Sequence, residues 1–115
     1  MANNIQTLRR SHDFELLKKK GKRIYPNDWL ILSYLENEEN QNRFGWVIPG
    51  KIGGSVLRNK IKRWCREYFR ERKLHPSKHF DVNVIIRASG NANYFKNLKF
   101  QEFKDELEFA VKKIK

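Results

Sequence analysis

The sequence predicts an α+β protein in which helices pack against one sheet, in the order α-β-β-β-α-β-α. Two observations predict this class. Apolar residues recur at helical spacing in three segments, near the start, in the middle and at the end of the chain. Short apolar runs, bounded by polar or proline-containing stretches, lie between those segments. With 115 residues and no repeat or linker, we expect a single domain over residues 1–115.

The first predicted element is a short helix that starts at Ser11. The Ser11 side chain is expected to cap the first turn, where Asp13 is favoured by the helix dipole. Phe14 and Leu17 share one face of this helix, and Gly21 is placed to end it.

Three strands are expected next. Residues 24–26 predict a short edge strand, because the proline in it cannot donate to a ladder. Residues 29–35 are nearly all apolar and predict a strand covered on both faces. After the polar loop 36–42, residues 44–49 predict the hairpin partner of that strand.

The second half of the sequence predicts a helix, a strand and another helix. A basic helix is expected over 56–73, a connection over 74–79, a strand over 82–87 and a loop over 89–93. The last segment has one apolar helical stripe, made of Phe100, Phe103, Leu107, Ala110, Val111 and Ile114.

The charge indicates a polyanionic partner. The formal net charge is +12 and the sequence pI is about 10.0. This excess does not separate RNA from DNA or from an anionic membrane. No apolar stretch is long enough to span a bilayer, and residues 1–8 lack the apolar region of a signal peptide, so we expect a cytoplasmic protein without a membrane partner. One cysteine, Cys65, excludes an internal disulfide and is expected to be buried.

The basic helix separates its residues onto two faces. Leu57, Ile61, Trp64, Cys65 and Tyr68 share the apolar face. Ser55 is expected to cap the helix, after a turn at Gly53 and Gly54. The opposite face carries Asn59, Lys62, Arg63, Arg66, Arg70 and Lys73, with Arg58 on the flank. Such a face suits a polyanion with closely spaced charges.

The order of residues from Lys51 to Arg70 resembles the signature of the bacterial ribonuclease P protein subunit. It reads Lys-x-Gly-x-(Ser/Ala)-Val-x-Arg-Asn-x-Ile-Lys-Arg-x-x-Arg-Glu-x-(Phe/Tyr) and includes the Arg-Asn-x-x-x-Arg core. The resemblance covers about residues 8–110. It implies the same element order and a left-handed crossover around the basic helix, as in folds like ribosomal protein S5 domain 2. Sequence patterns alone predict the usual right-handed crossover.

The resemblance implies two RNA-binding surfaces. One meets the catalytic RNA and comprises Lys51, Arg58, Asn59, Lys62, Arg63, Arg66 and Arg70. The family commonly has two basic residues at the first of these positions, where this chain has Gly50 and Lys51. The alternative for Arg58 is a structural salt bridge.

The second implied surface is a cleft for the single-stranded 5′ leader of precursor tRNA. Phe14 matches its first aromatic, while the family's other aromatics fall on Lys18 and Leu32; Trp46 is expected nearby. Phe14 as a simple core residue is the alternative.

The sequence shows no constellation for protein catalysis. Glu36, Glu38 and Glu39 fall in a polar loop, and the His75–His79 pair is interrupted by a proline. We therefore expect no catalytic residue, no metal site and no protein-bound cofactor. The resemblance implies that the RNA subunit hydrolyses the phosphodiester with Mg²⁺, which the RNA-containing holoenzyme requires.

The function implied by the resemblance is that of the protein subunit of ribonuclease P. It binds the catalytic RNA and the precursor-tRNA leader and promotes endonucleolytic maturation of the tRNA 5′ end. The alternatives are a ribosomal or other structural RNA-binding protein and a DNA-binding protein. Against the latter, the sequence has no helix-turn-helix pair. It also has no dimerisation stripe, so we expect no protein oligomer.

Overall fold

A computed structural model describes residues 5–88 and 93–114. Its elements are β1 (Gln6–Thr7), α1 (Ser11–Lys20), β2 (Lys22–Ile24), β3 (Leu30–Asn37), β4 (Arg43–Val47), the 3₁₀ turn η1 (Gly50–Ile52), α2 (Ser55–Arg70), β5 (His79–Ile86), α3 (Tyr94–Asn97) and α4 (Phe100–Val111). The α+β class and element order are thus confirmed, with β1, η1 and α3 as short additions. Most of the loop expected over 89–93 lies outside the described residues.

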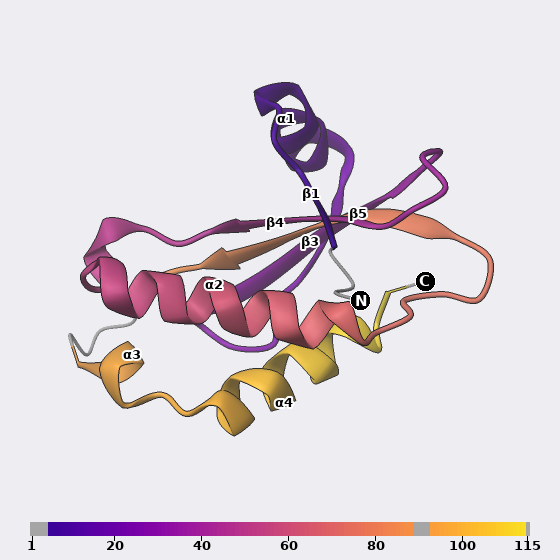
Figure 1. The fold of residues 1–115 in the computed structure, drawn as a ribbon. Coiled ribbons are helices and arrows are strands. Elements are labelled where there is room, and N and C mark those ends of the chain that lie inside the picture. Colours follow the sequence, from indigo (N-terminus) through magenta and orange to yellow (C-terminus); the bar gives the residue numbers. More distant parts are fainter. Residues whose placement is uncertain (1–4, 89–92, 115) are drawn as a thin grey trace.

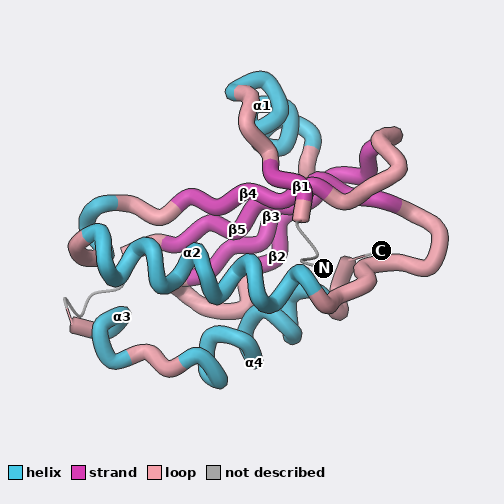
Figure 2. Tube along the Cα trace, viewed as in Figure 1, coloured by secondary structure: helices cyan, strands magenta, loops and turns pink. Residues whose placement is uncertain are grey.

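The five strands form one mixed sheet (Figure 1), and their order in it is β1-β4-β5-β3-β2 (Figure 2). β5 is the central strand: it pairs antiparallel with β3 and parallel with β4. β2 lies at one edge, as expected, but ends at Ile24 and so does not include Pro26. β5 begins three residues earlier than the sequence predicts.

The predicted hairpin between 29–35 and 44–49 is wrong, because β5 lies between β3 and β4. The loop that joins β3 to β4 instead passes the start of β5 and is tied to it. The Asn42 Oδ1 atom accepts a 2.8 Å hydrogen bond from the Phe80 N–H, and the Asn37 amide donates to Asp81 at 2.8 Å. The short polar loop between β3 and β4 therefore crosses over β5, which lies between them. The local sequence pattern does not indicate this crossing.

The helices lie on both faces of the sheet (Figure 2). α1 stands alone on one face, and α2 and α4 cover the other. Strand alternation divides the side chains between these layers. On β3, the residues Leu30, Leu32 and Tyr34 join the core beneath α2 and α4, which leaves Ser33 on the face of α1.

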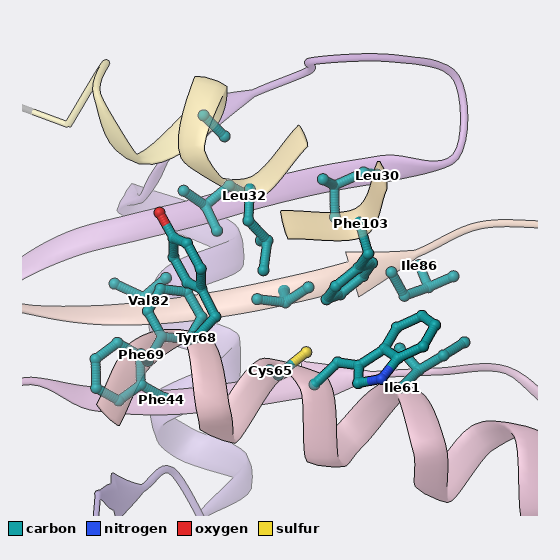
Figure 3. Packing of buried hydrophobic residues seen from close by; sticks show 14 of the residues in the cluster. Leu30, Leu32, Phe44, Ile61, Cys65, Tyr68, Phe69, Val82, Ile86 and Phe103 are labelled. Carbon is teal, nitrogen blue, oxygen red and sulfur yellow. The ribbon is translucent and has the colours of Figure 1, made fainter. Parts of the chain in front are cut away.

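The main core lies between the sheet, α2 and α4 (Figure 3). The apolar face predicted for the basic helix supplies Ile61, Trp64, Cys65 and Tyr68, all buried. Phe44 of β4 stacks on Phe69 with ring centroids 4.4 Å apart. The predicted stripe of α4 completes the core with Phe103, Leu107 and Ala110.

Two predicted helix caps are wrong. Ser11 and Ser55 are the first residues of α1 and α2; the cap positions are Arg10 and Gly54, and neither cap uses a side-chain hydrogen bond. Gly21 does end α1. Gly53 has a φ of 159°, which other residues rarely adopt, and a Cβ there would also lie 2.6 Å from Leu57 Cδ2; a Cβ at Gly54 meets nothing within 4 Å.

α2 connects the parallel neighbours β4 and β5, so it is the crossover of the fold. It ends at Arg70, three residues before the predicted end. Its left-handed sense stays a prediction from the resemblance. Among the helices of residues 5–88 and 93–114, none is both long enough and apolar enough to cross a bilayer.

Candidate nucleic-acid interface

The outward face of α2 carries a stripe of one asparagine and three arginines. Asn59, Arg63, Arg66 and Arg70 follow one another at spacings of three or four residues, and all four are exposed. In the described part of the chain, no ion pair joins Arg63, Arg66 or Arg70 to a carboxylate. Their guanidinium groups are therefore available to phosphates, which arginine can bind with two parallel hydrogen bonds.

The remaining predicted members of this surface lie at its margins. Lys51 is exposed on η1, just before α2, and Lys62 is half-buried on the helix. Arg58 is also half-buried, and its Nε donates a 3.1 Å hydrogen bond to the Gly53 carbonyl. The sequence left open that Arg58 forms a structural salt bridge. Among the described residues it forms none, and it bonds the loop backbone instead. Arg58 fixes the turn that leads into α2.

A further cation joins this surface from the N-terminal segment. Arg9, which is not among the residues predicted for this surface, lines a groove of about 350 Å³ together with Arg66 and Arg70. β1 brings it there by pairing with β4 beside the helix. The sequence does not indicate that Arg9 belongs to this surface, because Arg9 lies outside any motif and its position depends on the pairing of β1 with β4.

A separate groove of about 350 Å³ lies between α1 and the sheet. Its lining joins α1 to four strands and consists of Phe14, Leu17, Lys18, Arg23, Ser33, Val47, Asn83 and Ile85. Lys18 and Arg23 are exposed cations at its margin, and Phe14 is half-buried within it. An aromatic ring beside two cations is an arrangement that suits a single-stranded nucleic acid.

Phe14 lies directly on the sheet because Gly45 leaves room for it. A Cβ at Gly45 would approach the Phe14 ring to 2.7 Å and Leu8 to 3.3 Å. The ring also lines a second, smaller pocket of about 200 Å³, whose lining includes Trp46 and Arg66. Phe14 is therefore neither a fully buried core residue nor a free surface residue.

Leu32 does not line this groove, so its prediction as a leader contact is wrong. The side chain has 0% exposure and lies in the core beneath the helices (Figure 3). A shift of one residue along a strand exchanges the two faces. The residue of β3 that faces the groove is accordingly Ser33.

Trp46 joins the two surfaces rather than lining the groove under α1. It shares its side of β4 with Phe44, and the Arg66 guanidinium lies 5.3 Å from its ring centroid. The pocket that it shares with Phe14 opens between α1, β4 and α2. The two predicted surfaces thus meet at one pocket.

A buried charged network holds α1 on the sheet. Arg43 binds Asp81 through two hydrogen bonds of 2.8 Å, and its Nη2 lies 3.6 Å from an Asp13 oxygen on α1. The hydrogen bonds that Arg43 donates to Asp81 raise the pKa of Arg43. In the sequence, Asp81 stands alone just before a predicted strand. In the structure its carboxylate binds Arg43, so its role is to stabilise the fold.

The other reactive side chains have structural surroundings. Burial raises the pKa of the Cys65 thiol, which keeps it neutral. His75 Nδ1 accepts hydrogen bonds from the backbone N–H groups of Ser77 and Lys78. Within residues 5–88 and 93–114, no three His, Cys, Asp or Glu side chains gather as they do in a metal site.

Comparisons with known proteins agree on one family. The family model described as Ribonuclease P matches residues 2–115. The chain is similar to the ribonuclease P protein component of Thermotoga maritima, with 34% identity over 109 residues that cover 95% of this chain and 92% of the relative. It is also 34% identical to that of Syntrophomonas wolfei over 99 residues, which cover 86% and 82% of the two chains.

Solved structures give the same result. The RNase P protein from Thermotoga maritima superposes with a TM-score of 0.80 at 34% identity, over 96% of this chain and 98% of that one. The RNase P protein from Staphylococcus aureus superposes with a TM-score of 0.73 at 29% identity, over 92% of each chain.

Proposed function

This chain belongs to the ribonuclease P protein family, and from that premise we propose that it binds two RNAs through neighbouring surfaces. The exposed face of α2 binds the catalytic RNA of ribonuclease P. The groove beneath α1 holds the 5′ leader of precursor tRNA. The observation that carries this proposal is the pocket where Phe14, Trp46 and Arg66 meet, because it joins the exposed arginines of α2, which form no ion pair among the described residues, to an aromatic groove.

The two surfaces have different tasks. On α2, closely spaced guanidinium groups neutralise the repulsion between phosphates of the catalytic RNA and those of the substrate. Under α1, the Phe14 ring offers a stacking surface to a base, while Lys18 and Arg23 lie where they can pair with backbone phosphates. A precursor with a leader gains contacts that mature tRNA lacks.

Hydrolysis of the phosphodiester is assigned to the RNA subunit, with Mg²⁺ bound by that RNA. In this proposal the protein binds no metal or cofactor of its own and supplies no catalytic residue. The described residues support this division, since His75 bonds the backbone of its own loop and the buried acids Asp13 and Asp81 pair with Arg43. The protein acts as a monomer in the cytoplasm, without a membrane partner.

Reconstitution tests the proposal. The protein is combined with a bacterial ribonuclease P RNA, and precursor-tRNA cleavage is measured at low Mg²⁺. Cleavage is expected to rise above that of the RNA alone, and rigorously RNA-free protein is expected to give none. Metal-dependent cleavage by the protein alone contradicts the assignment of catalysis to RNA. An equal effect of the protein on unrelated structured RNAs favours a general RNA-binding protein instead.

A further inference from the structure

Arg66 differs from the other arginines on the outward face of α2, because its guanidinium has a fixed neighbour. The guanidinium lies 5.3 Å from the centre of the Trp46 ring, within the distance of about 6 Å at which an aromatic face attracts a cation. Among the described residues, neither Arg63 nor Arg70 lies over an aromatic ring in this way. Arg66 is therefore the arginine of this face whose side chain is held by a residue of the sheet.

Trp46 can hold another side chain because the sheet and the core hold Trp46 itself. The residue lies on β4, where it pairs with Val84 of the central strand β5. Its half-buried side chain packs against the main core cluster. A ring fixed by apolar packing does not follow a mobile side chain, so the contact restricts the movement of Arg66.

The contact with Trp46 leaves the hydrogen bonds of Arg66 free. An aromatic face attracts the positive charge of a guanidinium, whereas the N–H donors lie in the plane of the guanidinium and point away from its carbon. No carboxylate pairs with Arg66 within residues 5–88 and 93–114. Arg66 can therefore be oriented by Trp46 and still bind a phosphate through two parallel hydrogen bonds.

Arg66 is held where it lines a cationic groove of about 350 Å³ together with Arg9 and Arg70. Arg9 is oriented as well, since its Nε donates a 3.4 Å hydrogen bond to the Thr7 hydroxyl. A phosphate backbone that enters this groove meets donors that are already in position. Since ordering a long side chain costs conformational entropy, a side chain that is ordered before binding gives a tighter complex.

We propose that Trp46 is a positioning residue of the surface that binds the catalytic RNA. Its ring holds the Arg66 guanidinium in the orientation in which that group pairs with a phosphate of the RNA. This inference rests on the proposed function, since it names what orders one contact of the α2 face. Trp46 acts through Arg66, so its role differs from the place beside the leader that the resemblance predicts for it.

The variant Trp46→Leu tests this role, because it removes the ring and changes no charge. Binding of the full chain to a bacterial ribonuclease P RNA is measured by titration. The affinity is expected to fall about three- to tenfold, since one oriented contact becomes a mobile one. Trp46→Phe keeps an aromatic face and should retain most of the affinity. A loss as large for Trp46→Phe as for Trp46→Leu contradicts the role of the ring.

A double-mutant cycle separates positioning from an effect on the fold alone. In an Arg66→Ala background, Trp46→Leu should change the RNA affinity less than about twofold, because the side chain that the ring holds is already absent. Arg63→Ala is the matched control background: Arg63 is exposed on the same face without an aromatic neighbour in the described part of the chain, so the full effect should persist there. If Trp46→Leu does not fold, Trp46→Met replaces it in the cycle, because methionine fills irregular apolar space.

The outcomes separate this inference from the function on which it rests. An equal loss of affinity in all three backgrounds means that Trp46 contacts the RNA itself or serves only the fold, and the inference is wrong. If Arg66→Ala weakens RNA binding but Trp46→Leu does not, the inference is also wrong and the proposed function stands. If removing Arg63 and Arg66 together leaves RNA binding unchanged, the assignment of the α2 face itself is wrong.

Discussion

Single arginines on α2 differ in how free they are to bind RNA. Arg58 is tied to the Gly53 carbonyl, so its removal disturbs the turn before the helix as well as the surface. Arg66 lies over Trp46, and Arg63 is exposed without an ion pair among the described residues. Arg63 and Arg66 are therefore the better probes of RNA binding.

The double variant Arg63→Ala, Arg66→Ala should weaken binding to the catalytic RNA and leave the fold intact, because both side chains point away from the core. Each lost phosphate contact should lower the magnitude of the salt slope by about 1 or less. Binding titrations at several salt concentrations measure this. Lys112→Ala, which removes an exposed charge just after the end of α4, is the control. Unchanged affinity in the double variant contradicts the assignment of this face.

Phe14 gives the corresponding prediction for the groove. Phe14→Ala should weaken holoenzyme binding to precursor tRNA but not to mature tRNA. The loss of one base–aromatic stack costs about 1–3 kcal/mol, and we expect the low end because Lys18 and Ser33 provide no second ring. Lys18→Ala should add a salt-sensitive loss. Equal weakening for both tRNAs, or a large fall in melting temperature, would mean that Phe14 serves the fold instead.

Between elements, a polar contact joins α2 to α4 at the border of the core. The Tyr68 hydroxyl donates a 2.6 Å hydrogen bond to Glu108, and Arg72 Nε donates to the same oxygen at 3.1 Å. Burial raises the pKa of Tyr68, so its hydroxyl stays protonated and can donate. The Tyr68 hydrogen bond lowers the pKa of Glu108 from its ordinary value of 4.5.

The lowered pKa of Glu108 sets how the stability of the protein changes with pH. Because Glu108 holds its proton less tightly when folded, its contribution to stability is present above about pH 4.5 and is lost as the pH falls through its folded pKa. Tyr68→Phe should cost about 1 kcal/mol at neutral pH, a value reduced for the partial exposure of Glu108. The gap between variant and wild type in thermal melts should narrow below pH 4.5. A gap that is constant with pH would exclude Glu108 as the cause.

At the scale of the whole molecule, α1 is attached to the sheet by a face that contains buried charges. Arg43 of β4 connects Asp13 of α1 with Asp81 of β5 and has little exposure itself. The same network sets where α1 stands, and therefore where the groove under it opens. The position of the leader groove thus depends on a contact outside it.

Arg43→Leu should destabilise the protein by about 3–5 kcal/mol, because it leaves Asp81 and Asp13 buried without their cation. Chemical denaturation measures the difference. Lys22→Leu, at an exposed position on β2, should change the stability little. A loss below about 1 kcal/mol for Arg43→Leu would show that water or another side chain replaces the guanidinium.

Many features of this structure depend on residues close together in the sequence and could therefore be predicted from it. The two faces of α2, the burial of Cys65 and the stripe of α4 all follow from helical periodicity, which depends only on neighbours a few residues apart. The family follows as well, because its signature is a continuous run. The helix caps were missed since Arg10 and Gly54 take cap positions without a side-chain bond, which leaves nothing for a pattern to detect.

The sequence by itself therefore determined the class of fold, the element order, the family and the cationic face of α2. Only the tertiary structure decided that β5 separates β3 from β4, that Arg9 joins Arg66, and that Ser33 instead of Leu32 faces the groove. The physical reason is that backbone hydrogen bonds pair any two strands alike, so the choice of neighbour depends on contacts far apart in the chain. The sequence of β3 likewise does not show which of its residues face the groove. Both faces of this apolar strand are buried, so polar and apolar residues do not alternate along it, and its neighbours in the fold decide which face each residue takes.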